Sequence, residues 1–249
     1  MLNLFIFIEK ITMLYDNPAA RLKAILDTGK KHPEGHLCMD VWNAILGVRP
    51  DQKSEFFEKL GKVMELSNKT RQLIKTHYPH QIHAAEACLV RVDLAFSNQS
   101  LHGPWQSFSG QIDANAMSTL GFMADLLHSK VSAVVINQDE LNLIFKSFKE
   151  LLDIIDESTI SNSLKQYLVQ EINDLLNSIR DYKISGAIPI LKQAESMAGH
   201  VLLDPEYASF LKDHELGKRL LDNLNAMAAV LTVAVSLPQL ANFSKLLLN

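Results

Sequence analysis

Apolar residues recur at steps of three and four along most of this chain, and no other feature constrains its fold as strongly. The clearest runs lie at 82–96, 141–155 and 164–179. Side chains spaced in this way share one face of an α-helix. Only 10 glycines and 8 prolines occur among the 249 residues, which argues against a fold of many strands and turns. We therefore expect an all-α protein, a multi-helix bundle.

The helical runs are expected to form two lobes. The segment SKVSAVVIN at 129–137 separates them and is the best candidate for a boundary. It leaves an N-terminal helical lobe at 1–130 and a C-terminal helical lobe at 137–249. The second lobe is predicted to end in an apolar pair of helices within 206–249. One compact body is the alternative arrangement.

Two segments of the first lobe call for a specific prediction. Ser67 is a plausible helix cap, so the sequence predicts a separate short helix at 68–76. The stretch at 97–111, SNQSLHGPWQSFSGQ, is the longest irregular one. Because it contains Trp105 and Phe108, we expect it to be a packed loop rather than a flexible linker.

Charge and composition exclude several classes of protein. Hydrophobic residues make up 47% of the chain and charged residues 21%, which is typical of a globular protein rather than a disordered one. Residues 1–76 carry a net charge of +3 and residues 77–249 one of −7. The acidic part argues against a protein that wraps nucleic acid, although the first part could touch it locally.

Cysteine usage and the N-terminus favour a cytoplasmic location. Cys38 and Cys88 do not make a disulfide framework, and a reducing compartment is the simpler interpretation. The start, MLNLFIFIEKITMLYDNP, has no basic residue before its short apolar run and no small-residue cleavage site. We therefore expect no signal peptide here, but a helix packed on the body or an extension before Met13.

One stretch, RQLIKTHYPHQIH at 71–83, combines an arginine with three histidines. Its spacing R-x5-H resembles the R-x4–6-H motif of the all-helical HEPN ribonucleases. That resemblance implies that Arg71 would stabilise the developing phosphorane charge and that His77 would move the proton of the 2′-hydroxyl. Tyr78 and Pro79 follow directly, however, and they favour His77 as the last residue of a helix, where a protonated imidazole interacts well with the helix dipole.

Two groups of histidines are candidates for a metal site. His80 and His83 can share a helix face, with Glu86 three residues further on. Successive steps of three turn by about 60° around a helix, so the three side chains do not converge tightly. The second group, HPEGHLC at 32–38, offers two histidines and a cysteine without an evident partner pair. We expect neither a metal nor another cofactor.

Signatures of common enzyme families are missing from the sequence. It contains no G-x-x-x-x-G-K-[ST], G-x-G-x-x-G, G-x-S-x-G or H-E-x-x-H. Acidic pairs such as Asp153 and Asp156 lie among apolar residues at a helix end and are interpreted as a solvated face. The sequence thus favours a protein without catalytic activity.

The most unusual segment is an uncharged run of 22 residues at 223–244, whose length approaches that of a membrane span. Asparagines at its start and Pro238 near its end shorten the continuous apolar part to 226–237. As a helix this part would be about 18 Å long, well short of about 30 Å. A buried core helix, an interface and membrane insertion all stay open, in that order of preference. The interface positions would be Ala226, Ala229, Val230, Val233 and Leu237.

A series of short landmarks runs along the chain. They are Asn17-Pro18, where a helix can be capped and begin, VWNAILG at 41–47, VDLAFS at 92–97, PWQSF at 104–108, QIDANAM at 111–117 and IRDYKISG at 179–186. In this order they resemble a set of uncharacterised all-helical bacterial proteins, some of which are associated with phage-defence or mobile-element genes. The resemblance covers about 17–240, rests mainly on aromatic and turn residues, and implies no catalytic residues.

Taken together, these features predict a non-catalytic interaction or regulatory subunit of an intracellular bacterial multi-protein system, with phage defence implied by the resemblance. We expect a protein partner or a homo-oligomer, no nucleic-acid signature, no membrane and a cytoplasmic location. The first alternative is a membrane-acting effector that uses the C-terminal apolar helix. The second is a HEPN-like ribonuclease that uses Arg71 and His77.

Overall fold

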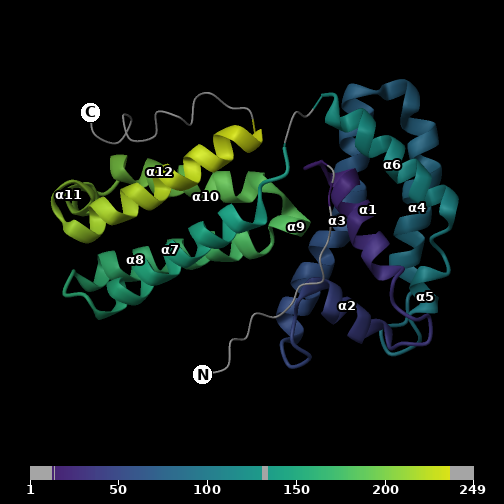
Figure 1. The fold of residues 1–249 in the computed structure, drawn as a ribbon, viewed down its shortest axis with the longest axis horizontal. Coiled ribbons are helices and arrows are strands. Elements are labelled where there is room, and N and C mark those ends of the chain that lie inside the picture. The colour runs from purple at the N-terminus through teal and green to yellow at the C-terminus, as the bar shows by residue number, and fades with distance from the viewer. Residues whose placement is uncertain (1–12, 14, 131–133, 236–249) are drawn as a thin grey trace. The chain divides into compact units, whose positions relative to one another are not determined.

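The computed structural model describes residues 13, 15–130 and 134–235. Within these ranges every regular element is a helix, with twelve α-helices, two short 3-10 helices and one isolated β-bridge between Leu37 and Pro104. The predicted all-α fold, a multi-helix bundle, is therefore confirmed. The chain divides into two compact units, 1–132 and 133–249 (Figure 1).

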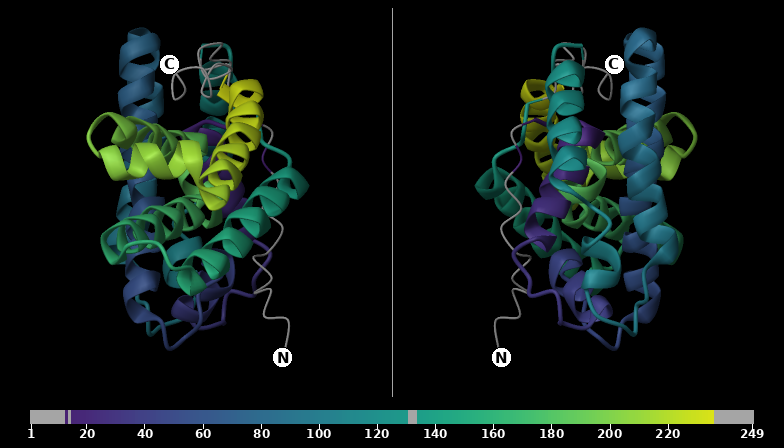
Figure 2. Two further views of the ribbon diagram at one scale, coloured as in Figure 1. Left: turned by 90° about the vertical axis from the view of Figure 1, so that its left-hand side faces the viewer. Right: turned by 90° about the vertical axis from the view of Figure 1, so that its right-hand side faces the viewer.

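The core of the first unit is formed by its four longest helices. α1 packs against α3 and α6, and α4 also packs against α3 and α6, as can be followed in Figure 2. The helices of this unit are α1 (Pro18–Gly29), α2 (Cys38–Leu46), α3 (Lys53–His77), the 3-10 helix η1 (Pro79–Gln81), α4 (Ile82–Asn98), α5 (Gln106–Ser109) and α6 (Ala114–His128).

Asn17 begins α1 and also fixes its position against α6. Its side-chain oxygen accepts a hydrogen bond from the backbone N–H of Ala20 at 3.0 Å, which is the N-cap interaction. Its Nδ2 donates to the carbonyl oxygen of Ala124 on α6, also at 3.0 Å. Both bonds are buried, so a single side chain satisfies a free helix end and joins two helices.

The helix break predicted at Ser67 is wrong, because α3 continues from Lys53 to His77 without interruption. A cap needs non-helical backbone, whereas Ser67 lies in the middle of the helix and is 1% exposed. Its position belongs to the buried stripe of α3, where Thr70 is also polar and bonds the carbonyl of Leu66 at 2.8 Å. Two polar residues in one stripe made its continuity hard to recognise. The stripe is Phe56, Leu60, Val63, Ser67, Thr70 and Ile74.

The irregular stretch between α4 and α6 is packed around two tryptophans. Trp105 is 1% exposed and donates from Nε1 to the carbonyl of Gly29 at the end of α1, at 3.0 Å. Its ring meets that of Trp42 edge-on, with centroids 5.2 Å apart. Trp42 in turn donates to Gln99 at 2.8 Å. The loop therefore forms part of the core of this unit, with Phe108 buried beside both indoles.

The second unit is a bundle in which α7, α8, α10 and α12 are the long helices. α7 packs against α8 and α12, while α10 packs against the same two helices and α11 packs on α12. The helices of this unit are α7 (Gln138–Glu157), α8 (Asn162–Arg180), α9 (Tyr182–Ser185), α10 (Ala187–Gly199), the 3-10 helix η2 (His200–Leu202), α11 (Pro205–Asp213) and α12 (Glu215–Val235).

Side-chain caps begin three of these helices. Asn137 accepts from the N–H of Asp139 at 2.8 Å, and Ser161 accepts from that of Leu164 at 3.3 Å. Asp204 begins α11 by accepting from two backbone N–H groups. The first turn of α7 also contains Asp139 and Glu140, whose negative charges interact favourably with the positive end of the helix dipole.

α12 contains the described part of the uncharged C-terminal run. One of its faces is buried against α7, α10 and α11. The residues of that face are Leu220, Leu224, Met227, Ala228 and Leu231. Over the described ranges, the structure contains no helix with the length and apolar character that crossing a bilayer requires. Residues 236–249, including Leu237, lie outside the described residues.

Candidate functional site

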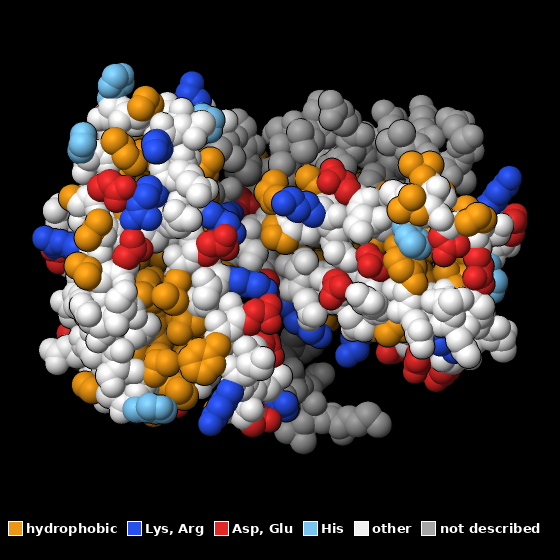
Figure 3. Space-filling model, turned by 180° about the vertical axis from the view of Figure 1, so that it is seen from behind, with side chains coloured by type: hydrophobic (Ala, Val, Ile, Leu, Met, Phe, Trp, Pro, Cys, Tyr) orange, Lys and Arg blue, Asp and Glu red, His pale blue; other side chains and the backbone are white. Residues whose placement is uncertain are grey.

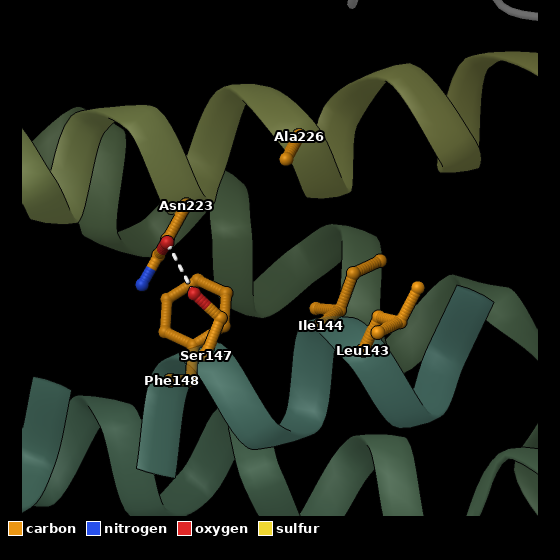
Figure 4. A pocket seen from close by; sticks show the side chains of 6 residues that line it. All are labelled: Leu143, Ile144, Ser147, Phe148, Asn223 and Ala226. Atoms are coloured by element: carbon orange, nitrogen blue, oxygen red, sulfur yellow. Dashed lines mark hydrogen bonds between the residues drawn. The ribbon is translucent and has the colours of Figure 1, made fainter. Parts of the chain in front are cut away.

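Two neighbouring hollows follow the line along which α7 and α12 pack. The first has a volume of about 220 Å³ and the second about 350 Å³. We call the two together the α7–α12 groove. The first hollow is lined by Leu143, Ile144, Ser147, Phe148, Asn223 and Ala226 (Figure 4). The second is lined by Val134, Val135, Ile136, Asn137, Glu140, Ala229, Val230 and Val233.

The groove is open because α12 places small side chains opposite larger ones. Ala226 stands across from Leu143 and Ile144 and is too short to reach them (Figure 4). Phe148 is fully buried and Ile144 is 8% exposed, whereas Leu143 on the rim is 69% exposed. The first hollow therefore has an apolar floor and an apolar rim that faces solvent.

One end of the groove is polar, and this end fixes how α7 and α12 are aligned. Ser147 donates from Oγ to Oδ1 of Asn223 at 2.6 Å, the bond drawn in Figure 4. One turn further along each helix, Arg219 and Glu150 approach to 3.7 Å. Nδ2 of Asn223 is buried and has no hydrogen-bond partner among the described residues. A buried amide held by one strong contact is sensitive to a shift of either helix.

Four of the five predicted interface residues line this groove. Ala226 belongs to the first hollow, and Ala229, Val230 and Val233 to the second. Their steps of three, one and three place them on the side of α12 that does not face the core. Val233 is 72% exposed. Leu237 lies outside the described residues.

The opposite wall of the groove, on α7, was missed by sequence reasoning. Leu143 does not belong to the buried stripe of α7, so the sequence gives it the pattern of an isolated surface leucine. Val134 and Val135 precede the helix in the segment interpreted as a boundary. An apolar residue outside a strong stripe was the available signal, but single exposed apolar residues are common.

Arg71 is held by two carboxylates rather than pointing to a free site. Its Nε lies 2.9 Å and 3.0 Å from the two carboxylate oxygens of Glu86, and its Nη2 lies 2.7 Å from Asp93. Partial burial lowers the pKa of Arg71, but the bonds to Asp93 and Glu86 outweigh this effect and the net shift is upward. His77 is the exposed last residue of α3. Six residues turn a helix by about 240°, so the two side chains leave α3 on different sides.

Three of the other histidine candidates, His36, His80 and His83, are exposed, and His32 is half-buried. His80 lies in η1 and His83 in the first turn of α4. At the first residue of α2, burial raises the pKa of the Cys38 thiol to about 11, and its Sγ contacts Oε1 of Gln99 at 3.5 Å. A neutral thiol is a poor metal ligand. No group of three potential ligands comes together among the residues that the structure describes.

Tyr167, His200 and Tyr207 form another group of titratable side chains, where α8, η2 and α11 meet. The rings of Tyr167 and His200 stack with centroids 3.9 Å apart, and Tyr207 is fully buried. Burial raises the pKa of both tyrosines above the ordinary value. Both hydroxyls thus stay protonated at neutral pH, and the group is best explained as packing between three elements.

The surface charges are mixed in sign. On the face shown in Figure 3, Lys and Arg side chains alternate with Asp and Glu side chains, and neither sign forms a broad patch. Many are paired along one helix, for example Lys62 with Glu58 and Lys69 with Glu65. Phosphate-backbone binding needs a continuous positive surface, which this face does not offer.

The chain matches no protein-family model, and neither a curated protein nor a solved structure is significantly similar to it. The α7–α12 groove is therefore the feature from which a function has to be inferred.

Proposed function

We propose that this chain is a non-catalytic interaction protein whose α7–α12 groove receives an apolar helical segment of a protein partner. In this proposal it is a regulatory or accessory subunit of a cytoplasmic bacterial multi-protein system. The link to such a system, and to phage defence, comes only from the sequence landmarks described above. The groove carries the rest of the proposal.

The single observation behind the proposal is the exposed apolar lining of both walls. Leu143 is 69% exposed on α7, while Val233 is 72% and Val134 53% exposed at the second hollow. Apolar side chains gathered at a hollow, rather than scattered singly, mark binding surfaces in soluble proteins. A groove between two packed helices suits a third helix, which presents apolar residues at steps of three and four.

A catalytic role has weaker support. The guanidinium of Arg71 is bonded to Glu86 and Asp93, so a phosphate would have to compete with two carboxylates. The imidazole of His77 leaves α3 in another direction. The ribonuclease alternative would therefore require a rearrangement of α3 and α4.

The proposal can be tested with a displayed library of amphipathic helical peptides selected on the full chain. Selected peptides should carry apolar residues at steps of three and four. Their affinity should fall roughly tenfold or more with Leu143→Asp and with Val233→Asp, since each places a charge in an apolar contact worth about 1.4 kcal/mol or more.

Leu202→Asp is the matched control, because Leu202 is 88% exposed in the same unit and does not line the groove. This variant should bind as the wild type does. The proposal would be contradicted if the selected peptides bound all three variants equally, or if no peptide were selected. Partitioning into anionic vesicles that Val233→Asp abolishes would instead support the membrane effector.

A further inference from the structure

Two stripes of side chains run along the rims of the α7–α12 groove, one on each helix. The members of each stripe fall within about 60° of one another on a helical projection. All of them are exposed except Arg219, which is half-buried. The α7 stripe is Leu143, Lys146 and Glu150, and the α12 stripe is Ala226, Asp222 and Arg219.

Contacts across the groove show which residues of the two stripes lie at the same level. Ser147 bonds Asn223, and one turn further along each helix Glu150 approaches Arg219. The two helices are therefore antiparallel, and each step forward on α7 corresponds to one step back on α12. Glu150 and Arg219, which carry opposite charges, lie level with each other.

The other members of the two stripes are also complementary at equal levels. Leu143 lies level with Ala226 at the first hollow, so a large side chain has a small one across from it. Lys146 lies level with Asp222 to within two residues, or about 3 Å along the helix axis. Asp139, at the start of α7, lies level with the uncharged part of α12. Like charges therefore never share a level.

Within one chain these charges are weakly paired. The side chain of Lys146 is 75% exposed, and its Nζ lies 3.8 Å from Glu150. Arg219 lies 3.7 Å from the same carboxylate. Exposed ion pairs contribute little to stability, the more so at such lengths. Asp222 forms no ion pair within the described ranges. The stripes thus retain charge that a partner can pair.

We propose that the partner of the groove is the same face of a second copy of this chain. The inference rests on the proposed function, because it names the partner of that same groove. A two-fold axis along the groove places α7 over α12 of the second copy, and α12 over its α7. Rotation about this axis keeps every residue at its level. Leu143 then enters the hollow at Ala226 of the second copy, and Lys146 meets Asp222 of the second copy.

The arrangement that results is a group of four helices in which every neighbour is antiparallel, the usual geometry of a four-helix bundle. The interface is isologous, so each contact occurs twice. Both apolar hollows are covered, and each charge at the rims faces an opposite charge. Such complementarity selects this pairing over one with the helices shifted, because a shift brings like charges together.

Sedimentation velocity of the full chain over a concentration series tests the proposal. The wild type should approach twice its mass of 27.9 kDa. Lys146→Glu and Asp222→Lys should each weaken dimerisation roughly tenfold or more, because each creates two contacts between like charges. Lys192→Glu is the matched control, since Lys192 is an exposed lysine on α10 and does not line the groove. This variant should dimerise as the wild type does.

A charge swap shows whether the two positions meet between copies. An equimolar mixture of Lys146→Glu and Asp222→Lys should dimerise again, because both contacts in the mixed dimer join opposite charges. The double variant Lys146→Glu/Asp222→Lys should recover for the same reason. The proposal is overturned if the wild type stays monomeric over the whole series, if the single variants dimerise as the wild type does, or if the mixture stays as monomeric as its components.

Failure of the two proposals is distinguishable when the helical peptides are also tested on Lys146→Glu, whose groove is expected to be open. Groove peptides that bind a monomeric wild type would keep the proposed function and overturn the second copy as partner. A dimer that passes the charge swap, in a chain whose Lys146→Glu variant binds no peptide, would keep the second copy and contradict the proposed function.

Discussion

At the scale of single residues, the first unit depends on how closely the loop tryptophan approaches the end of α1. A Cβ at Gly29 would lie 2.7 Å from Cζ2 of Trp105. That ring is buried and its Nε1 bonds the carbonyl of Gly29 itself, so it cannot move away freely. Because Gly29 has no side chain, the loop can close over the core.

Gly29→Ala should therefore destabilise the protein by about 1–3 kcal/mol, the usual cost of overpacking. Gly61→Ala is the matched control, since a Cβ there has no atom within 4 Å. Gly61 lies in the middle of α3, where alanine should add up to about 1 kcal/mol of stability. Thermal melts of both variants test these two opposite changes in stability. If Gly29→Ala stabilised the protein, the packing at this position would be looser than described.

Arg71→Ala should lower the free energy of unfolding by about 1 kcal/mol, because it removes the bonds to Glu86 and Asp93 at a partly exposed site. Urea denaturation measures the loss. Arg71→Lys should recover part of it, since lysine keeps the charge but not the forked geometry. An unchanged unfolding curve, accompanied by the loss of an RNA-cleaving activity, would revive the ribonuclease alternative.

The two buried thiols should make the first unit sensitive to alkaline pH. Burial raises the pKa of both Cys38 and Cys88 from 9.0 to about 11. The folded state therefore binds more protons than the unfolded state in this window, so stability is fully present below pH 9.0 and falls as the pH rises towards about 11. Denaturation at a series of pH values should show a shallower decline in Cys38→Ala/Cys88→Ala than in wild type. Equal slopes would contradict the assignment.

At the scale of elements, the continuous α3 is the clearest difference from expectation. Ser67 has the residue type of a cap but the position of a core residue, and its Oγ has no hydrogen-bond partner in the described part of the chain. Local residue preference was outweighed by the apolar stripe on either side of it. A cap is predicted from its residue type, whereas packing decides whether the helix ends there.

Ser67→Ala should raise the free energy of unfolding by about 1 kcal/mol, because it removes an unpaired buried hydroxyl and improves helix propensity. Thr70→Ala serves for comparison. Its hydroxyl bonds the carbonyl of Leu66, so its removal should destabilise the protein instead. Chemical denaturation of the two variants measures both changes. A loss of stability in Ser67→Ala would mean that the Ser67 hydroxyl has a hydrogen-bond partner.

At the scale of the whole molecule, the helical class and the start of α1 at Asn17-Pro18 could be predicted from the sequence, because stripes and caps are local signals. Of the two walls of the groove, only the residues on α12 were indicated by the sequence. The uncharged run drew attention to Ala226, Ala229, Val230 and Val233, but its length could not separate a core face from an exposed one. The α7 wall depends on which helix packs against α12, a long-range pairing that no local pattern encodes.

The central claim is that the α7–α12 groove is a docking surface, and methyl NMR of the full chain tests it most directly. On titration with a selected helical peptide, the methyl signals of Leu143, Ile144, Val230 and Val233 should shift or broaden together. Those of Leu202, and of Leu94 in the first unit, should stay in place. Saturable shifts confined to the first unit, with the groove methyl signals unchanged, would contradict the account.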